Sequence, residues 1–271
     1  MAHGLTADQI ARCEHEGFVF PIAVLSPDEA AYYHERYDEA LRKGTELGSD
    51  VVNVKGHLVL KWMADLARDP RILDAVECLL GPNILCWTTT FFVKRPGDYT
   101  YVSWHQDATY WGLSGPQVYS AWLAFTPSNR TSGCMRVIPG SHRELVPHAD
   151  TFDEKNLLSR GQQLAVDVDD SRAVDIELEP GQMSLHHVQI VHGSSPNTSP
   201  LPRIGFVVRY ISTEIEQMSG FRDSAMLVRG EDHHSHFDLE TVPDRDFDPD
   251  ALARFERLRE RRNRILYREV S

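Results

Sequence analysis

The spacing of apolar and polar residues changes near residue 83 of the chain. Before that point, apolar residues recur at helical intervals, as in Ile72, Leu73 and Val76. Capping residues at the starts and glycines at the ends predict three helices, over about residues 7–17, 27–44 and 70–81. We therefore expect residues 1–82 to form a helical region that supports the rest of the chain.

After residue 83, short runs of β-branched and aromatic residues alternate with clusters of Gly, Pro, Asn and Ser. These runs predict strands over residues 84–94, 101–104, 118–126, 135–139, 173–178, 182–186 and 204–212. Many short strands at close spacing favour a β-sandwich or barrel over a parallel sheet. Residues 140–170 are too polar for the core and are predicted as an insertion, whereas residues 248–268 predict a charged, solvent-facing helix.

The length of 271 residues fits one large β domain or two smaller domains. Because no stretch resembles a linker, we favour a single domain over residues 1–271. Its parts would be the helical region 1–82, a β core over 83–215 that carries the 140–170 insertion, and a C-terminal segment over 216–271.

Composition narrows the classes of function. The chain has 28 Lys and Arg against 40 Asp and Glu, a net charge of −12 that repels nucleic-acid phosphates and anionic membranes. The 4 cysteines fit no zinc motif and are predicted to be free thiols. The sequence begins without a signal-peptide pattern and has no run of 18 apolar residues. These features predict a cytoplasmic enzyme that binds neither nucleic acid nor membrane.

The clearest chemistry lies in the stretch Trp104-His105-Gln106-Asp107. Alternate side chains of a strand share a face, so His105 and Asp107 can point into one cavity. His192, 85 residues after Asp107, is the best candidate for a third ligand. Two histidines and one carboxylate form the facial triad of non-haem Fe(II) oxygenases, which leaves coordination positions open.

This spacing alone is weakly specific, because the chain has 13 histidines. Arg203, eleven residues after His192, strengthens the assignment. A guanidinium grips a carboxylate through two parallel hydrogen bonds. An open iron site with a cation nearby suits a 2-oxo acid that chelates the metal while O2 takes the last position.

Three segments, WHQDATYW, SGCMRVIPGSH and HGSSPNTSPLPRIGF, resemble motifs of the phytanoyl-CoA dioxygenase family. The similarity runs from about residue 15 to residue 240 and is stronger with bacterial members that act on small molecules than with the mammalian acyl-CoA enzyme. It implies a mainly β fold with flanking helices around a double-stranded β-helix, or cupin-like jelly roll. It also implies an Fe(II)- and 2-oxoglutarate-dependent dioxygenase that uses O2 and releases succinate and CO2.

The resemblance further implies roles for individual residues. The iron ligands would be His105, Asp107 and His192. The residues in contact with 2-oxoglutarate would be Arg203 and Ser194 at its distal carboxylate, Trp122 as a pocket wall, and Thr90. A lysine of the family's helical region matches Lys55 or Lys61. Halogenases of this superfamily have Ala or Gly in place of the carboxylate ligand, so Asp107 favours hydroxylation or a related oxidation.

Substrate contacts are predicted around this site. Tyr110 and Trp111 either line the substrate pocket or fill its mouth, and His142 either faces the substrate or caps a turn. Arg160, in the insertion, either binds substrate or forms a surface ion pair. Further polar candidates are Lys94, Arg143 and Arg209.

Two other histidine-rich features have less specific interpretations. His186 and His187 are adjacent on a predicted strand, so only one can point inward, where a hydrogen-bonded core histidine is the expected role. Residues 231–236 contain metal-ligating side chains in a polar segment, which predicts a solvated loop or a lid over the substrate.

We expect the protein to hydroxylate, or otherwise oxidise, a small polar metabolite or natural-product intermediate. Two other classes remain open at this level. A cupin-like protein could bind metal and ligand without turnover. An oxidative nucleic-acid demethylase is also compatible with the motif, although the net charge of −12 and the absence of a basic stripe disfavour it.

Overall fold

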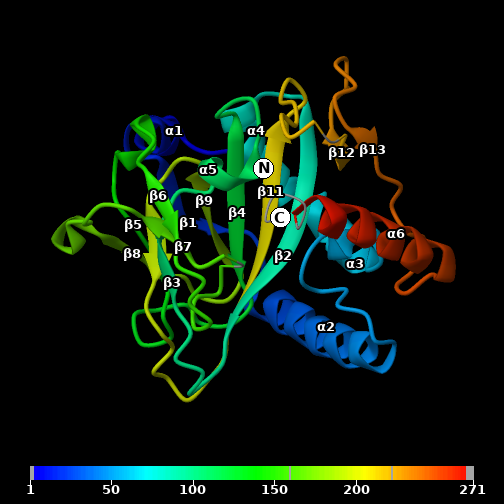
Figure 1. Cartoon of the computed structure of the whole chain (residues 1–271), viewed down its shortest axis with the longest axis horizontal. Coiled ribbons are helices and arrows are strands. Elements are labelled where there is room, and N and C mark those ends of the chain that lie inside the picture. Colours follow the sequence, from blue (N-terminus) through cyan, green and yellow to red (C-terminus); the bar gives the residue numbers. More distant parts are fainter. Residues whose placement is uncertain (1–2, 159, 221, 267–271) are drawn as a thin grey trace.

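The β-strands come from every region of the chain, including the part before residue 83 (Figure 1). The computed structural model describes residues 3–158, 160–220 and 222–266. The strands are β1 (Phe18–Ala23), β2 (Ile84–Lys94), β3 (Val102–His105), β4 (Val118–Ala124), β5 (Met135–Val137), β6 (His148–Asp150), β7 (Gln162–Leu164), β8 (Val174–Ile176), β9 (Gln182–His187), β10 (His192–Ser194), β11 (Arg203–Ser212), β12 (Ser224–Arg229) and β13 (Asp238–Leu239). The α-helices are α1 (Ala7–Glu16), α2 (Pro27–Glu46), α3 (Lys61–Ala67), α4 (Pro70–Leu80), α5 (Ala108–Trp111) and α6 (Pro249–Leu266).

Two sheets build the jelly roll. The larger has the strand order β1-β9-β4-β11-β2-β12-β13, and the smaller has the order β3-β10-β5-β8. The apolar cluster around Trp122, Met135 and Ile176 joins residues of β4, β5 and β8, so it lies between the two sheets. Helices α2, α3 and α6 lie on the side of the larger sheet away from the smaller one (Figure 1). This arrangement confirms the predicted mainly β fold with a double-stranded β-helix core.

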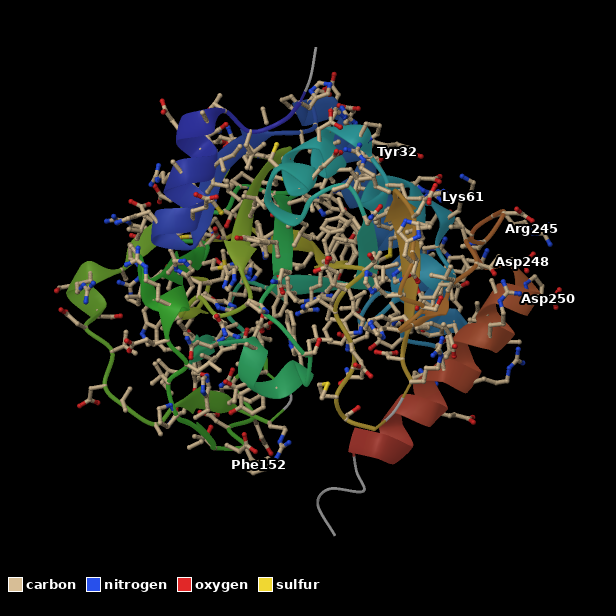
Figure 2. All side chains as sticks on the ribbon, turned by 90° about the horizontal axis from the view of Figure 1, so that it is seen from above. Tyr32, Lys61, Phe152, Arg245, Asp248 and Asp250 are labelled. Atoms are coloured by element: carbon tan, nitrogen blue, oxygen red, sulfur yellow. The ribbon has the colours of Figure 1, made fainter. Side chains whose placement is uncertain are left out.

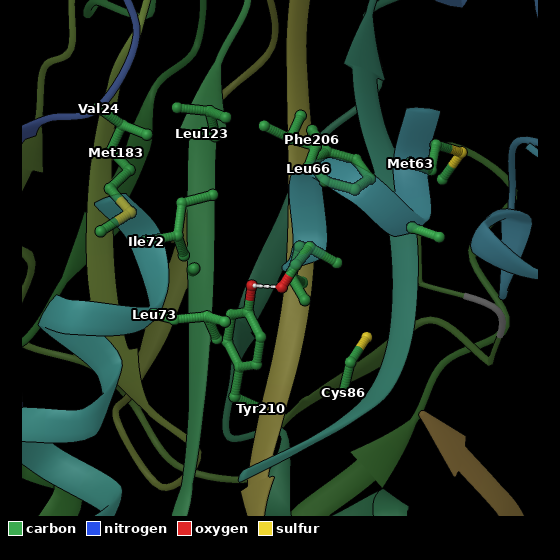
Figure 3. Close-up of a cluster of buried hydrophobic side chains, with 14 of the residues drawn as sticks. Val24, Met63, Leu66, Ile72, Leu73, Cys86, Leu123, Met183, Phe206 and Tyr210 are labelled. Atoms are coloured by element: carbon green, nitrogen blue, oxygen red, sulfur yellow. Dashed lines mark hydrogen bonds between the residues drawn. The ribbon is translucent and has the colours of Figure 1, made fainter. Parts of the chain in front are cut away.

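Strand β11 shows how the alternation of side chains separates the core from the site. Phe206, Val208 and Tyr210 belong to the large cluster that includes residues of α3 and α4. Figure 3 shows part of this cluster, in which the buried Tyr210 hydroxyl donates a hydrogen bond of 2.8 Å to the Ala67 carbonyl. The other face of β11, which includes Arg203 and Val207, is directed toward the smaller sheet and lines a cavity there.

The predicted helix starts are confirmed by capping contacts. Thr6 and Gln9 form a reciprocal capping box at α1, and Ser26 and Glu29 form one at α2. Asp69 caps α4, and Gly17 ends α1 in the left-handed conformation. Helix α2 continues to Glu46, slightly beyond its predicted end.

The seven predicted strands are present with small shifts at their ends, but six others were missed. Residues 1–82 are not purely helical, because β1 pairs with β9 at the edge of the larger sheet. The 140–170 insertion contains the hairpin β6–β7, and its Leu164 is buried against Ile138 and Val191. Hence this insertion is not wholly outside the core. The turn of the hairpin carries Phe152, which stands exposed at the edge of the molecule (Figure 2).

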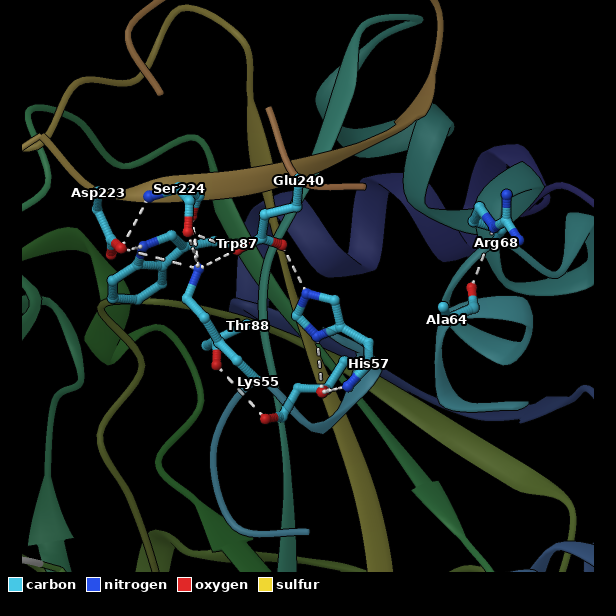
Figure 4. Close-up of polar contacts among 10 residues, drawn as sticks. Lys55, His57, Ala64, Arg68, Trp87, Thr88, Asp223, Ser224 and Glu240 are labelled. Atoms are coloured by element: carbon cyan, nitrogen blue, oxygen red, sulfur yellow. Dashed lines mark hydrogen bonds and ion pairs between the residues drawn. The ribbon is translucent and has the colours of Figure 1, made fainter. Parts of the chain in front are cut away.

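A buried ionic network ties the C-terminal segment to the larger sheet (Figure 4). Lys55 Nζ donates to the Ser224 carbonyl at 2.5 Å and to Glu240 at 2.7 Å, and His57 contacts the same carboxylate at 2.7 Å. Burial alone would raise the pKa of Glu240, but Lys55 and His57 outweigh it and lower that pKa to about 2. Lys55 is therefore committed to this network. Within the described part of the chain, no helix has the length and apolar character needed to cross a membrane.

Candidate metal centre

Strand pairing brings the three predicted metal ligands together. His105 ends β3, Asp107 follows in the next turn, and His192 begins β10. Strands β3 and β10 are antiparallel neighbours, and His192 lies directly opposite His105 in the ladder. One ligand atom from each of His105, Asp107 and His192 lies within 4.8 Å of the others, and all three residues are buried. The register of this ladder therefore assembles a group that is far apart in sequence.

Hydrogen bonds fix which nitrogens of the two imidazoles face the centre. Nδ1 of His105 lies 2.9 Å from the Ser103 carbonyl, and Nδ1 of His192 lies 3.0 Å from the Ile190 carbonyl. Since a carbonyl only accepts, each Nδ1 carries the proton and each Nε2 keeps its lone pair. His105 Nε2 lies 3.4 Å from an Asp107 carboxylate oxygen. These contacts hold the rings in the orientation that metal ligation needs.

The electrostatics of the group also suit a divalent cation. Burial would raise the pKa of Asp107, but the nearby His105, His192 and Arg209 favour its ionised form, so that pKa falls below its usual range. Burial, followed by the proximity of His105, lowers the pKa of His192 well below its usual value. At neutral pH, the centre therefore presents a carboxylate and an uncharged His192 imidazole.

One cavity connects this group to the predicted cofactor residues. The three ligands line it, together with Ser194, Trp122 and Arg203. Arg203 is 2% exposed and lies over the Trp122 ring, with 5.3 Å between guanidinium carbon and ring centroid. The structure thus places these three predicted cofactor residues in the same cavity as the metal group.

Arg203 itself shows that the cavity fits an anion. Its Nη1 donates to the Gly133 carbonyl, and its Nε has no hydrogen-bond partner among the described residues. Burial lowers its pKa to about 10, and no carboxylate of the described chain pairs with it. A buried guanidinium without a counter-ion costs free energy, which a bound carboxylate would offset. The site therefore fits both a divalent metal and an acidic cofactor.

Comparison with known proteins agrees with this geometry. The family model described as Phytanoyl-CoA dioxygenase (PhyH) matches residues 13–205. The chain belongs to the phytanoyl-CoA dioxygenase family. It is therefore a 2-oxoglutarate-dependent oxygenase with Fe(II) and 2-oxoglutarate as its cofactors and O2 as co-substrate.

Similar proteins cover most of the chain. An ectoine dioxygenase of Bordetella bronchiseptica is 24% identical over 238 residues, which span 79% of this chain and 77% of that protein. The peroxisomal phytanoyl-CoA dioxygenase of Bos taurus is 28% identical over 222 residues, spanning 72% of this chain and 65% of that protein. A solved structure described as the non-heme monooxygenase ThoJ in its apo form has a TM-score of 0.87 and 36% identity, covering 97% of this chain and 99% of that one.

Gln106 is a site residue that sequence reasoning passed over. In this member of the phytanoyl-CoA dioxygenase family, Gln106 is fully buried and stands in the sequence between the metal ligands His105 and Asp107. Its side chain donates to the carbonyls of Gln189 at 2.6 Å and Glu144 at 2.8 Å, and accepts from the Val146 amide at 2.8 Å. Its own amide donates to His148 Nε2 at 2.8 Å. Gln106 thus holds the turn between His105 and Asp107 against the 140–170 insertion and against the loop before β10.

Two predicted substrate residues, His142 and Arg160, and one predicted 2-oxoglutarate contact, Thr90, lie outside the cavity wall. His142 hydrogen-bonds the Glu14 carbonyl of α1 at 3.2 Å, so it fixes a turn rather than facing the metal group. Arg160 pairs with Asp150 at 2.6 Å, in the surface ion pair that was the alternative prediction. The Thr90 hydroxyl donates to the Asn53 carbonyl. The structure gives these three residues no contact with the cavity.

Neither Tyr110 nor Trp111 is among the residues that line the cavity. Tyr110 packs edge-on against His148, and burial followed by Asp150 raises its pKa to about 12. Trp111 supports Arg209, whose guanidinium carbon lies 4.6 Å from the ring centroid. Arg209 is the member of this group that lines the cavity.

The other polar and histidine candidates also fall into residues that line the cavity and residues that lie away from it. Arg143 donates to the His15 carbonyl at 2.7 Å, away from the cavity, and Lys61 pairs with Asp65 on the surface. His186 lines the cavity and His187 does not, as strand alternation requires. The expectation of a hydrogen-bonded core histidine is wrong for His186, because its Nδ1 has no partner within the described chain.

The histidine-rich residues 231–236 form a largely exposed loop between β12 and β13. His234 and His236 stack with ring centroids 5.6 Å apart, and His233 approaches Glu231 at 3.4 Å. No set of three ligand atoms gathers in this loop, where all residues are described. The loop matches the solvated-segment prediction, and it does not line the metal cavity.

We expect Gly205→Ala to disturb the cofactor cavity through Trp122. A Cβ at this position would lie 1.9 Å from Cζ2 of the Trp122 ring, so the ring must move. Such overpacking typically costs about 1–3 kcal/mol, and it should also weaken 2-oxoglutarate binding. Thermal unfolding and cofactor titration test this expectation. The double variant with Trp122→Phe, which removes the clashing ring, should recover stability; no recovery would place the cause elsewhere.

Proposed function

We propose that the protein hydroxylates, or otherwise oxidises, a small polar metabolite or natural-product intermediate, with release of succinate and CO2 from 2-oxoglutarate. The observation that carries this proposal is one cavity that contains both the His105–Asp107–His192 group and the buried Arg203 without a counter-ion. In this proposal, the three ligands hold Fe(II), while Arg203 and Ser194 bind the distal carboxylate of 2-oxoglutarate beside Trp122.

When bound, iron and 2-oxoglutarate supply the oxidising chemistry, in which O2 activation is coupled to decarboxylation of the keto acid. The residues of the chain bind, orient and exclude water. His105 and His192 are held by their Nδ1 hydrogen bonds, and Gln106 holds the turn between His105 and Asp107. The indole of Trp122 and the apolar residues between the sheets would keep bulk water from the carboxylate of bound 2-oxoglutarate. No side chain is required as a general acid or base.

The cavity wall beside the metal ligands supports a polar substrate. Ser120, His186 and Arg209 lie opposite one another on β4, β9 and β11, and all three line the cavity. Ser120 Oγ and His186 Nδ1 have no hydrogen-bond partner within the described residues, so they can bind polar groups of a ligand.

The proposal is tested by anaerobic titration with Fe(II) and 2-oxoglutarate, followed by oxygenation with a panel of small polar compounds. We expect 2-oxoglutarate binding that requires the metal, and oxygen-dependent succinate that rises with particular compounds, each yielding an oxidised product. Reactions without O2 or without iron are the controls. Failure to bind 2-oxoglutarate in the presence of Fe(II) would contradict the proposal, and metal and ligand binding without oxygen-dependent succinate would indicate a non-catalytic cupin-like protein.

A further inference from the structure

A second buried basic residue lies beside Arg203. Lys94 is the last residue of β2, pairs with Arg203 in the β2–β11 ladder, and is 0% exposed. The charge of Arg203 acts on it directly, and no carboxylate of the described chain pairs with either residue. A protonated Lys94 beside the buried Arg203 is therefore unfavourable unless a ligand supplies negative charge.

The contacts of Lys94 converge on the segment after His192. Its Nζ lies 2.6 Å from Ser194 Oγ and 3.1 Å from the Ser194 carbonyl, and it also contacts the Ser195 carbonyl. Ser194 lines the cavity, whereas Lys94 lies behind it. Lys94 therefore acts on a ligand in the cavity through the Ser194 hydroxyl.

The direction of the Lys94–Ser194 hydrogen bond depends on the charge of the lysine. An ammonium can only donate, so Ser194 Oγ must accept, and its own proton is then free to point into the cavity. A neutral amine has a lone pair, and with two carbonyls beside it the favourable partner for that lone pair is the Ser194 hydroxyl proton. In that state, Ser194 donates to Lys94 and presents only acceptor lone pairs to the cavity.

We propose that Lys94 is a proton-linked positioning residue of the 2-oxoglutarate site, which in its charged form turns the Ser194 hydroxyl into a donor for the distal carboxylate. This inference rests on the proposed function and adds a residue that is not part of the cavity wall. If Lys94 has this role, 2-oxoglutarate binds more tightly when Lys94 is protonated. Binding of the dianion is then accompanied by uptake of a proton wherever free Lys94 is neutral.

The sign of the pH dependence follows from the surroundings of Lys94. Burial, followed by the charge of Arg203, lowers its pKa to about 6 in the cofactor-free protein. The other groups that face it keep their charge between pH 6.5 and 8.5, since the pKa of Arg203 is about 10 and burial raises the pKa of the Cys134 thiol to about 12. A carboxylate in the cavity raises the pKa of Lys94. Affinity for 2-oxoglutarate should thus fall as pH rises through this range, by up to about tenfold per unit.

The first test needs no variant. Titration of 2-oxoglutarate into the anaerobic Fe(II) protein, by calorimetry at pH 7.5 in two buffers of different ionisation enthalpy, gives the number of protons taken up. We expect up to one proton per 2-oxoglutarate, because the carboxylates of the ligand are already ionised at this pH. Uptake of no proton would overturn the proposal.

The second test removes the amine. Lys94→Met should weaken 2-oxoglutarate binding roughly 10- to 100-fold at pH 6.5, the range of one charge-assisted hydrogen bond, and should abolish the pH dependence of the affinity. Lys61→Met is the matched control, because Lys61 lies on the surface (Figure 2) and its ammonium pairs with Asp65. Ser194→Ala should remove the same pH dependence. The double variant Lys94→Met/Ser194→Ala should bind 2-oxoglutarate about as tightly as the single variant that binds it less tightly, because both substitutions remove the same contact.

The outcomes separate this inference from the proposed function. If the wild-type Fe(II) protein does not bind 2-oxoglutarate, the proposed function fails. If it binds and Lys94→Met keeps the wild-type affinity and pH profile, only the role of Lys94 fails. A purely structural lysine would lower the melting temperature of the cofactor-free variant and leave the pH profile of binding unchanged, which would also contradict the proposal.

Discussion

Asp107→Ala is expected to abolish metal-dependent turnover and to weaken Fe(II) binding by at least about 100-fold, since loss of groups that merely support a metal ligand already costs about 10–100-fold. Asp107 provides the carboxylate of the three-residue group, and its depressed pKa keeps it ionised at neutral pH. Without it, only the imidazoles of His105 and His192 would face the cation. Anaerobic metal titration and oxygen-dependent succinate formation measure the two effects.

Two further variants make this result specific to the carboxylate. Asp107→Asn keeps the shape of the side chain but removes its charge, so it should lose activity as Asp107→Ala does. Asp98→Ala removes an exposed carboxylate nine residues earlier and should leave both measurements unchanged. Full succinate release and product formation in Asp107→Asn would show that the ligand assignment is wrong.

The parts of the fold that local sequence determines were predictable. The helix starts at Thr6 and Ser26 and the apolar strand Ile84–Lys94 depend on neighbouring residues, and the structure confirms them. Strand β10 was missed because His192-Gly193-Ser194 has no β-branched or aromatic run; its conformation comes from pairing with β3 and β5 on either side. Strand β1 contains Pro21 and was missed for a related reason, since a proline argues against a strand unless it lies at a sheet edge.

In the candidate site too, local sequence predicts some features, whereas others depend on contacts between distant segments. The residues His105, Asp107 and His192 could be proposed from side-chain chemistry, but their approach depends on the β3–β10 register, which is not local. Lys94 looked like one polar residue among several, because its burial beside Arg203 follows from the β2–β11 ladder. Gln106 gave no signal, since the carbonyls that it binds belong to the insertion and to the loop before His192.

Arg203→Met is expected to weaken 2-oxoglutarate binding by about 2–5 kcal/mol, roughly 30- to 4,000-fold, which is the usual effect of truncating one partner of a buried charge pair. Methionine keeps much of the volume beside Trp122 while the positive charge is lost. Fe(II) binding should be unchanged, because Arg203 is not one of the three metal ligands. Calorimetric titration with 2-oxoglutarate and a separate metal titration distinguish the two sites.

The stability of the same variant tests why Arg203 is present. In the cofactor-free protein, its guanidinium is buried with no ion-pair partner among the described residues. Replacing such a charge by an apolar side chain is often neutral or stabilising, so the melting temperature without cofactor should stay the same or rise. The gain in melting temperature on adding 2-oxoglutarate should shrink. Arg172→Met, at an exposed position, should change neither quantity. An unchanged 2-oxoglutarate affinity in Arg203→Met would remove Arg203 from the cofactor site and leave its guanidinium with the Gly133 carbonyl and the Trp122 ring as its contacts.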